Sequence, residues 1–242
     1  MERVVYQQMA ELDDRHWWYR ARRAIIADLI RREARPPAGA EILEIGCGTG
    51  HNLAMLSGFG NVDGLELDDE ARALSEKRLG RSVMRSPLPE LSEVADHHYD
   101  LIGAFDVIEH IENDAAALES IVAKLKPGGK FVMTVPAHQW MWTAHDVVNH
   151  HKRRYSKRSL KALIAASPLK LDKIGYFNSL LFPIAVAERA ASKLRRREDA
   201  DVTLPPALLN ATLESVFRAE RYVVGRLPLP PGLSLFAVAS AR

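Results

Sequence analysis

Apolar positions in the first part of the chain recur at the spacing of a helix face. Trp18, Ile25 and Leu29 follow one another at intervals of seven and four residues, and arginines fill many positions between them. The segment RPPAG at 35–39 carries two prolines and a glycine, which end such a helix. The pattern predicts an N-terminal helix over 12–34 that could fold over the core as a lid.

Short apolar runs and helical patterns then alternate along the chain. Asn113 is a candidate N-cap for one of the helices, which Pro127-Gly128-Gly129 end. Strands that alternate with helices form βαβ units, so we expect a parallel sheet with helices on both faces. The predicted strands are 41–45, 62–67, 82–84, 99–108 and 130–135, and the predicted helices are 51–56, 68–79 and 113–126.

The C-terminal part is less regular. A loop over 136–155 is rich in histidine, tryptophan and basic residues, and a helix capped by Ser156 or Ser159 follows it. Strands are predicted at 169–178 and 233–241, with two helical patterns between them. The fold class is α/β, a doubly wound, mostly parallel seven-stranded sheet. One domain is expected over 1–242, with a core at 41–177, a helical insertion at 178–230 and a last strand at 232–242.

Composition narrows the class of protein. Apolar residues make up 47% and charged residues 26%, as in soluble globular proteins. The formal charge of +2 and the lack of a basic stripe argue against a nucleic-acid partner. Cys47 is the single cysteine, so no internal disulfide forms. The opening residues lack a signal-peptide pattern and the longest apolar run, 180–187, is too short to span a bilayer, so a cytoplasmic protein is expected.

The first predicted strand runs into a glycine-rich turn. In a doubly wound sheet such a turn lies at the carboxyl ends of the strands, where ligands bind. A dinucleotide fingerprint would place its third glycine at His51, but here that glycine comes one residue early, at Gly50. The pattern E-x-G-x-G-x-G from Glu44 to Gly50 suits an adenosine ligand without phosphates, such as S-adenosylmethionine.

Polar side chains follow the next strand tips. Glu66 ends the second strand, twenty residues after Gly46, and can accept hydrogen bonds from both ribose hydroxyls of either ligand. Phe105 ends the fourth strand and could pack against an adenine face. Asp106, Glu109 and His110 follow it on the rim.

Four motifs in order carry a family resemblance. LEIGCGTGHN, LELDD, FDVIEHI and LKPGGKFVMTVP resemble the motifs of class I S-adenosylmethionine-dependent methyltransferases, in the small-molecule group called type 11 or 12. Many relatives carry an aspartate before a Leu-Pro pair, whereas this chain has Arg85 and Ser86 before Leu88-Pro89. The resemblance implies S-adenosyl-L-methionine as cofactor, with contacts from Glu44, Gly46, Cys47, Gly48, Gly50, Glu66, Leu67, Ser86, Leu88, Phe105 and Asp106.

The sequence defines the residues that would bind the methyl acceptor less closely than those that would bind the cofactor. A general base is required only if the acceptor must lose a proton, and the candidate catalytic residues are His110, His145 and Asp146. Each could instead have a packing or capping role. Arg154 could bind an anionic group or belong to a solvated turn. The histidines of 138–151 match no zinc spacing, so no metal is predicted.

The sequence is compatible with several reactions and several binding partners. The leading hypothesis is methyl transfer to a small-molecule or lipid-linked acceptor, and the others are an NAD-dependent oxidoreductase and a non-catalytic binding module. The segment 178–197 joins an apolar stretch to a basic end, which suits peripheral membrane contact. A helical cap over the substrate pocket or a dimer interface would explain this pattern as well. The oligomeric state is expected to be a monomer or a homodimer.

Overall fold

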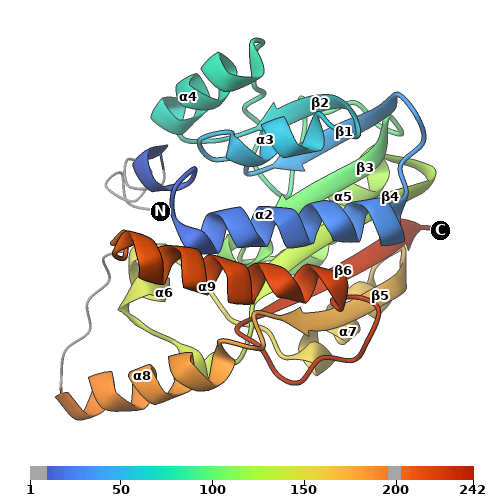
Figure 1. Ribbon diagram of the computed structural model, residues 1–242. Coiled ribbons are helices and arrows are strands. Elements are labelled where there is room, and N and C mark those ends of the chain that lie inside the picture. The colour runs from blue at the N-terminus through green and yellow to red at the C-terminus, as the bar shows by residue number, and fades with distance from the viewer. Residues whose placement is uncertain (1–9, 196–202) are drawn as a thin grey trace.

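A computed structural model describes residues 10–195 and 203–242, and these residues contain a six-stranded sheet (Figure 1). The strand order is β2-β1-β3-β4-β6-β5, and β6 runs antiparallel to β4 and β5, whereas the other neighbouring strands are parallel. The predicted doubly wound α/β class is confirmed. The strands are β1 Ala40–Ile45, β2 Gly60–Leu65, β3 Tyr99–Phe105, β4 Leu125–Pro136, β5 Leu169–Phe177 and β6 Ser234–Ala241.

The prediction of seven strands was wrong by one within the described residues. The predicted strand at 82–84 is an isolated parallel bridge, in which the Met84 amide donates to the Gly64 carbonyl at 2.9 Å. The Glu66 amide donates back to the Met84 carbonyl at 3.0 Å. A turn at Gly80 and the proline at 87, which has no N–H, leave room for no further pairs.

Helices cover both faces of the sheet, as the alternating pattern predicted. One face packs against α5 and α7, and the other against α2, α3 and α9 (Figure 1). The faces alternate along β1, because Leu43 and Ile45 join the first cluster and Ile42 joins the second. The helices are α2 Trp17–Leu29, α3 His51–Leu56, α4 Asp69–Leu79, α5 Asp114–Lys124, α6 Ala144–Val148, α7 Lys157–Ala166, α8 Phe182–Arg195 and α9 Ala207–Ala219.

Side-chain caps fix the starts of several helices. The side chain of Asp68 accepts hydrogen bonds from the backbone of the first turn of α4. The predicted cap Asn113 accepts from the Ala116 amide at the start of α5, and Ser156 caps α7. These residues satisfy backbone donors that the helix itself leaves unpaired.

The N-terminal helix is shorter than the predicted span 12–34. The chain turns at residues 13–16, α2 begins at Trp17, and a π-helical turn over Ile30–Ala34 ends it. Ring nitrogen Nδ1 of His16 accepts from the Trp18 amide at 3.3 Å and caps α2. The interruption was not visible in the periodicity because the apolar spacing continues across it.

The segment 178–230 contains α8 and α9. Glu220, directly after α9, contacts the start of this segment. Its buried carboxylate accepts from the amides of Asn178, Ser179 and Leu180 at 2.6–2.7 Å. Helix α9 lies beside α2, while α8 points away from the sheet (Figure 1). Among the described residues, no helix has both the length and the apolar character needed to cross a membrane.

Candidate active site

A cavity of about 880 Å³ opens at the carboxyl ends of β1, β2 and β3. This is the point where the strand order reverses, since β1 lies between β2 and β3. Segments from the N-terminal helix, the loop 136–155 and α8 also line it. Most of the residues predicted to contact the cofactor line this cavity, namely Gly46, Cys47, Gly48, Glu66, Leu67, Ser86, Leu88, Phe105 and Asp106.

Gly46 and Gly50 of the turn both have a positive φ, but only Gly46 lines the cavity. Gly46 has a φ of 67°, and a Cβ there would lie 2.7 Å from Cγ2 of Val107. Gly50 has a φ of 85° and does not line the cavity. A Cβ on Gly50 would lie 2.8 Å from the Cα of Ser75, so this glycine allows α3 to approach α4.

Glu66 is held rigidly at the edge of the cavity. One carboxylate oxygen accepts from the Gly48 amide at 2.8 Å, and the other accepts from the Leu67 and Asp68 amides at 2.8 and 2.9 Å. A carboxylate offers about four acceptor positions. The three backbone donors therefore fix its orientation at the edge of the cavity.

Glu44 lies behind the glycine turn, and it does not line the cavity. Its Oε1 accepts from Asn52 at 2.8 Å, and its Oε2 has no hydrogen-bond partner among the described residues. Burial raises the pKa of Glu44 to about 8, although the Asn52 hydrogen bond and the positive charge of Arg22 oppose that rise. The neutral form of Glu44 is therefore favoured at pH 7.

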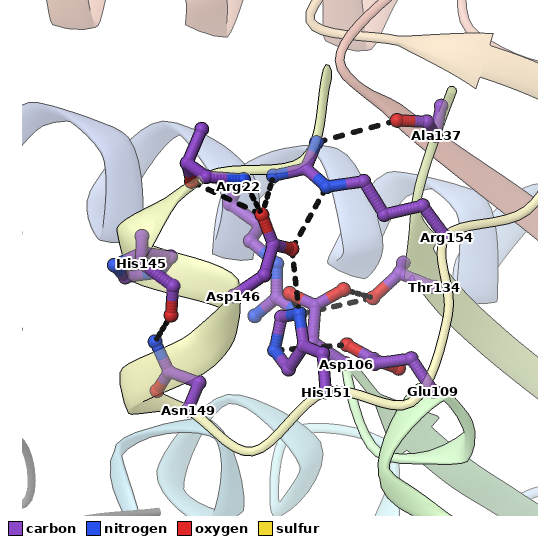
Figure 2. Close-up of polar contacts among 11 residues, drawn as sticks. Arg22, Asp106, Glu109, Thr134, Ala137, His145, Asp146, Asn149, His151 and Arg154 are labelled. Carbon is purple, nitrogen blue, oxygen red and sulfur yellow. Dashed lines mark hydrogen bonds and ion pairs between the residues drawn. The ribbon is translucent and has the colours of Figure 1, made fainter. Parts of the chain in front are cut away.

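Arg22 brings a positive charge from α2 into the lining of the cavity. Its Nη2 donates to Asp106 at 2.6 Å and to Thr134 at 2.9 Å, and Thr134 donates to Asp106 at 3.1 Å (Figure 2). The Arg22 guanidinium lies 5.0 Å from the ring centroid of Trp18, and its buried Nε has no hydrogen-bond partner among the described residues. This network ties the N-terminal helix to the tips of β3 and β4.

A second contact ties the N-terminal segment to the glycine turn. Asp13 forms an ion pair with Arg23 and lies 3.1 Å from Nδ1 of His51. Burial lowers the pKa of His51 to about 4. Sequence reasoning used His51 only as the residue that breaks the dinucleotide fingerprint, and it missed Asp13 and Arg23 because their contact depends on the turn at 13–16.

Asp146 lies behind the cavity wall and does not line the cavity. Arg154 binds both carboxylate oxygens, at 2.8 and 2.9 Å, and Nδ1 of His151 lies 2.9 Å from Oδ1 (Figure 2). Thr143 adds donors from its amide and hydroxyl at 2.7 and 3.0 Å. Burial would raise the pKa of Asp146, but the hydrogen bonds from His151 and Arg154 outweigh burial and hold it well below its usual range.

The predicted residues His110 and His145 do line the cavity, together with Glu109 and His151. Burial, followed by the charge of His151, lowers the pKa of His110 to about 4, so its ring is neutral at pH 7. Burial raises the pKa of Glu109, which is fully inaccessible to solvent. Sequence reasoning placed Glu109 on an exposed rim and gave His151 no separate role.

Comparisons with known proteins agree with this geometry. The family profile described as a methyltransferase domain matches residues 17–173. A protein of Mycolicibacterium smegmatis named "Probable S-adenosylmethionine-dependent methyltransferase" is 26% identical over 172 residues, which cover 69% of this chain and 65% of that protein. A ubiquinone biosynthesis O-methyltransferase of Nitrosospira multiformis is 26% identical over 132 residues, covering 52% of this chain and 50% of that protein.

This chain thus spans less than two thirds of the length of either relative. Among solved structures, phosphoethanolamine N-methyltransferase 2 of Haemonchus contortus has a TM-score of 0.56 and 18% identity, over 89% of this chain and 51% of that one. That likeness concerns the fold. The profile covers more than half of the chain, which confirms the family that the four motifs predicted. The chain belongs to the methyltransferase domain family.

Proposed function

We propose that this protein binds S-adenosylmethionine in the cavity and transfers its methyl group to a small-molecule or lipid-linked acceptor. The observation that carries the proposal is the composition of the cavity. The glycine turn and Glu66 form one end of its lining, and His110 and His145 are contributed by the segments beyond β3 and β4. One space could therefore hold a nucleoside and an acceptor together.

The residues at the turn fit a sulfonium nucleoside better than a dinucleotide. The Gly48 amide already donates to Glu66, so it is not available to a pyrophosphate. His51 begins α3 at the position where a dinucleotide site needs glycine, and its ring is buried against Asp13. Glu66 would hold the ribose hydroxyls, and Arg22 would face the methionine carboxylate.

The solved Haemonchus contortus enzyme is named as a complex with S-adenosyl-L-methionine, which supports this cofactor for a protein of the same fold. S-adenosylmethionine supplies a methyl group already activated on a sulfonium for in-line displacement. The chain then has to align the acceptor and exclude water, and alignment alone can supply about 7–11 kcal/mol of the barrier.

His110 and His145 are the residues that we propose contact the acceptor. The neutral His110 ring can accept a hydrogen bond from a hydroxyl or an amine. Proton removal by a positioned base contributes about 10²–10⁴-fold to a rate. We assign Asp146 a positioning role, since its oxygens are bound to His151, Arg154 and Thr143 and it does not line the cavity.

Substitution of Glu66 tests the cofactor proposal. Glu66→Ala removes acceptors for two hydroxyls, each worth about 1.5–3 kcal/mol with a charged partner. We expect the affinity for S-adenosylhomocysteine, measured by calorimetry, to fall by at least about tenfold. Because Glu66 also accepts three backbone donors, Glu66→Gln and a thermal melt of each variant accompany it.

The matched control is Glu90→Ala, an exposed carboxylate that does not line the cavity. It should bind like the wild type. Unchanged affinity in a folded Glu66→Ala variant would remove the ribose assignment.

Helix α8 supports the lipid-linked alternative. Ala185, Glu188 and Arg189 line the cavity, while Leu180 and Ile184 nearby are 53% and 62% exposed. We propose that this apolar face contacts a lipid surface that presents the acceptor. The side chains from 192 onward in the predicted membrane segment 178–197 lie outside those that the structure describes.

Partition onto anionic vesicles tests this contact. The double variant Leu180→Ser/Ile184→Ser should lower the partition coefficient at least about tenfold, because each side chain loses about 1.5–3 kcal/mol of apolar transfer when fully buried. Leu208→Ser on α9, where the side chain is 82% exposed, is the control and should change little. Equal partition of both variants and the wild type would contradict a lipid contact through α8.

A further inference from the structure

We propose that Glu109, His110 and His151 bind a divalent first-row transition-metal cation in the wall of the cavity. One carboxylate oxygen and one ring nitrogen from each histidine all lie within 4.8 Å of one another. The three residues come from two segments, the 3-10 turn Ile108–His110 after β3 and the loop after α6. Sequence spacing alone could not reveal the group, because His151 is far along the chain from the other two.

A backbone hydrogen bond and a ring contact hold these two segments together. The Lys152 amide donates to the Glu109 carbonyl at 2.8 Å. The rings of His110 and His151 meet edge to face, with centroids 4.6 Å apart. The juxtaposition of the three side chains is therefore built into the fold.

The surroundings of Glu109 suit a bound cation. Its side chain is fully buried, it lines the cavity, and neither carboxylate oxygen has a hydrogen-bond partner among the described residues. The nearest histidine nitrogen to its carboxylate is Nε2 of His151, 4.0 Å from Oε1 (Figure 2). The charged form of a carboxyl buried without donors is strongly destabilising unless it is paired or coordinates a metal. A cation between Glu109 and the two imidazoles would satisfy it.

His151 has the orientation of a metal ligand. Its Nδ1 lies 2.9 Å from Asp146, so Nδ1–H donates to that carboxylate and Nε2 is left to face Glu109 (Figure 2). Metal-bound histidines commonly donate their other ring nitrogen to a carboxylate in this way, which fixes the tautomer and the ring. Arg154 in turn fixes Asp146 with two hydrogen bonds.

The donor set selects the kind of cation. Two imidazoles and one carboxylate suit zinc, iron, cobalt or nickel, whereas magnesium and calcium prefer oxygen ligands. Three protein ligands leave coordination positions open, as in catalytic metal sites. Since all three residues line the cavity, an open position could be filled by an oxygen of the acceptor, and His110 would then contact the acceptor through the cation rather than directly. This role rests on the proposed function and makes the acceptor an oxygen-bearing ligand, such as a hydroxyl compound.

Cobalt and zinc titrations of the tag-free, full-length protein test the site. After treatment with a chelator, the wild type should bind one equivalent of Co²⁺ with a visible absorption band, and Zn²⁺ should displace it. Glu109→Gln and His151→Gln should each lower the affinity for Co²⁺ by at least about tenfold. His98→Gln, an exposed histidine that does not line the cavity, is the control and should bind like the wild type.

Asp146→Asn separates orientation from ligation. Loss of a hydrogen-bonded carboxylate behind a metal ligand typically costs about 10–100-fold in metal affinity, so we expect a decrease in that range with the Co²⁺ band retained at saturation. A thermal melt of every variant reports whether the protein is still folded, and calorimetry with S-adenosylhomocysteine reports whether the cavity binds the nucleoside. A wild type without a saturable Co²⁺ site, or folded Glu109→Gln and His151→Gln variants that bind Co²⁺ as tightly as wild type, would overturn the inference.

The same titrations keep the two proposals apart. Binding of S-adenosylhomocysteine without binding of Co²⁺ would overturn the metal site and leave the methyltransferase proposal standing. Binding of Co²⁺ at Glu109 and His151 without any binding of the nucleoside would support the metal site and refute the cofactor proposal.

Discussion

Three carboxylates around the cavity are chemically alike and differ in what surrounds them. Glu66 accepts three backbone donors at the cavity edge, which orients it for a ligand. Asp146 is held by Arg154 and His151, which makes it a fixed anion behind the wall. Among the described residues, Glu44 accepts a hydrogen bond from Asn52 alone, and it is buried, so its neutral form is favoured. Environment, rather than residue type, thus assigns the three roles.

The raised pKa of Glu44 predicts a pH-dependent stability. The folded-state pKa of about 8 lies above the ordinary value of 4.5, so the folded protein binds this proton more tightly than the unfolded chain. The contribution is fully present below pH 4.5 and is lost as the pH rises toward 8, by at most about 1.4 kcal/mol per pH unit.

Urea unfolding of the ligand-free protein at pH 5 and pH 8.5 measures this effect. Glu44→Gln lacks the ionisable group. Its free energy of unfolding, relative to that of the wild type, should therefore be higher at pH 8.5 than at pH 5. A difference between the proteins that stays constant with pH would show that Glu44 is not buried in its neutral form.

The residues at the strand tips were accessible to sequence reasoning, and those in the loops were not. Glu66 and Phe105 follow apolar runs whose ends a strand pattern marks, and parallel strands bring such ends to one edge. Glu109 and His151 meet only because the loop 136–155 folds around Asp146. That loop has no periodicity, and its conformation depends on long-range hydrogen bonds that no local pattern reports.

At the scale of elements, Glu220 fixes the insertion to the core. It is fully buried and accepts from the amides of Asn178, Ser179 and Leu180, which lead from β5 into α8. In the sequence, Glu220 interrupts the helical spacing of Leu209, Leu213, Val216 and Val223 with a polar residue. The structure explains the exception, because the carboxylate pairs buried backbone donors that would otherwise have none.

Glu220→Ala should therefore destabilise the protein. Each buried donor left without a partner costs about 1–3 kcal/mol, so a loss of at least about 2 kcal/mol in the free energy of unfolding is expected. Hydrogen exchange should speed up at residues 178–182 in particular. The control is Glu214→Ala on α9, which loses only ion pairs with the partly exposed Arg20 and Arg218. Equal stability of the two variants would contradict the anchoring role.

The lengths of two elements differ from those that the sequence pattern predicted. The predicted helix 12–34 is interrupted at 13–16, where Asp13 turns back to pair with Arg23 and His51. The predicted strand at 82–84 is a single bridge, because too few residues separate its flanking turns. Both differences come from neighbours in space, whereas hydrophobic periodicity reports only neighbours in the chain.

At the scale of the whole molecule, segments from both ends of the chain meet around the cavity. Asn210 of α9 accepts from the Trp17 amide at 3.0 Å and donates to the Arg15 carbonyl at 2.9 Å, which joins α9 to the start of α2. Helix α2 in turn reaches the strand tips through Arg22. Contacts between segments that are far apart in the sequence therefore enclose the cavity. Segments that are neighbours in the site are not neighbours along the chain.

Calorimetric titration of the wild-type protein with S-adenosylmethionine and with NAD, in parallel and in one buffer, is the most direct test of the central claim. Saturable binding of S-adenosylmethionine with one site per chain, and no detectable binding of NAD, is the result that the cavity predicts. Binding of NAD in place of S-adenosylmethionine would contradict the assignment of the glycine turn and Glu66 to a sulfonium nucleoside.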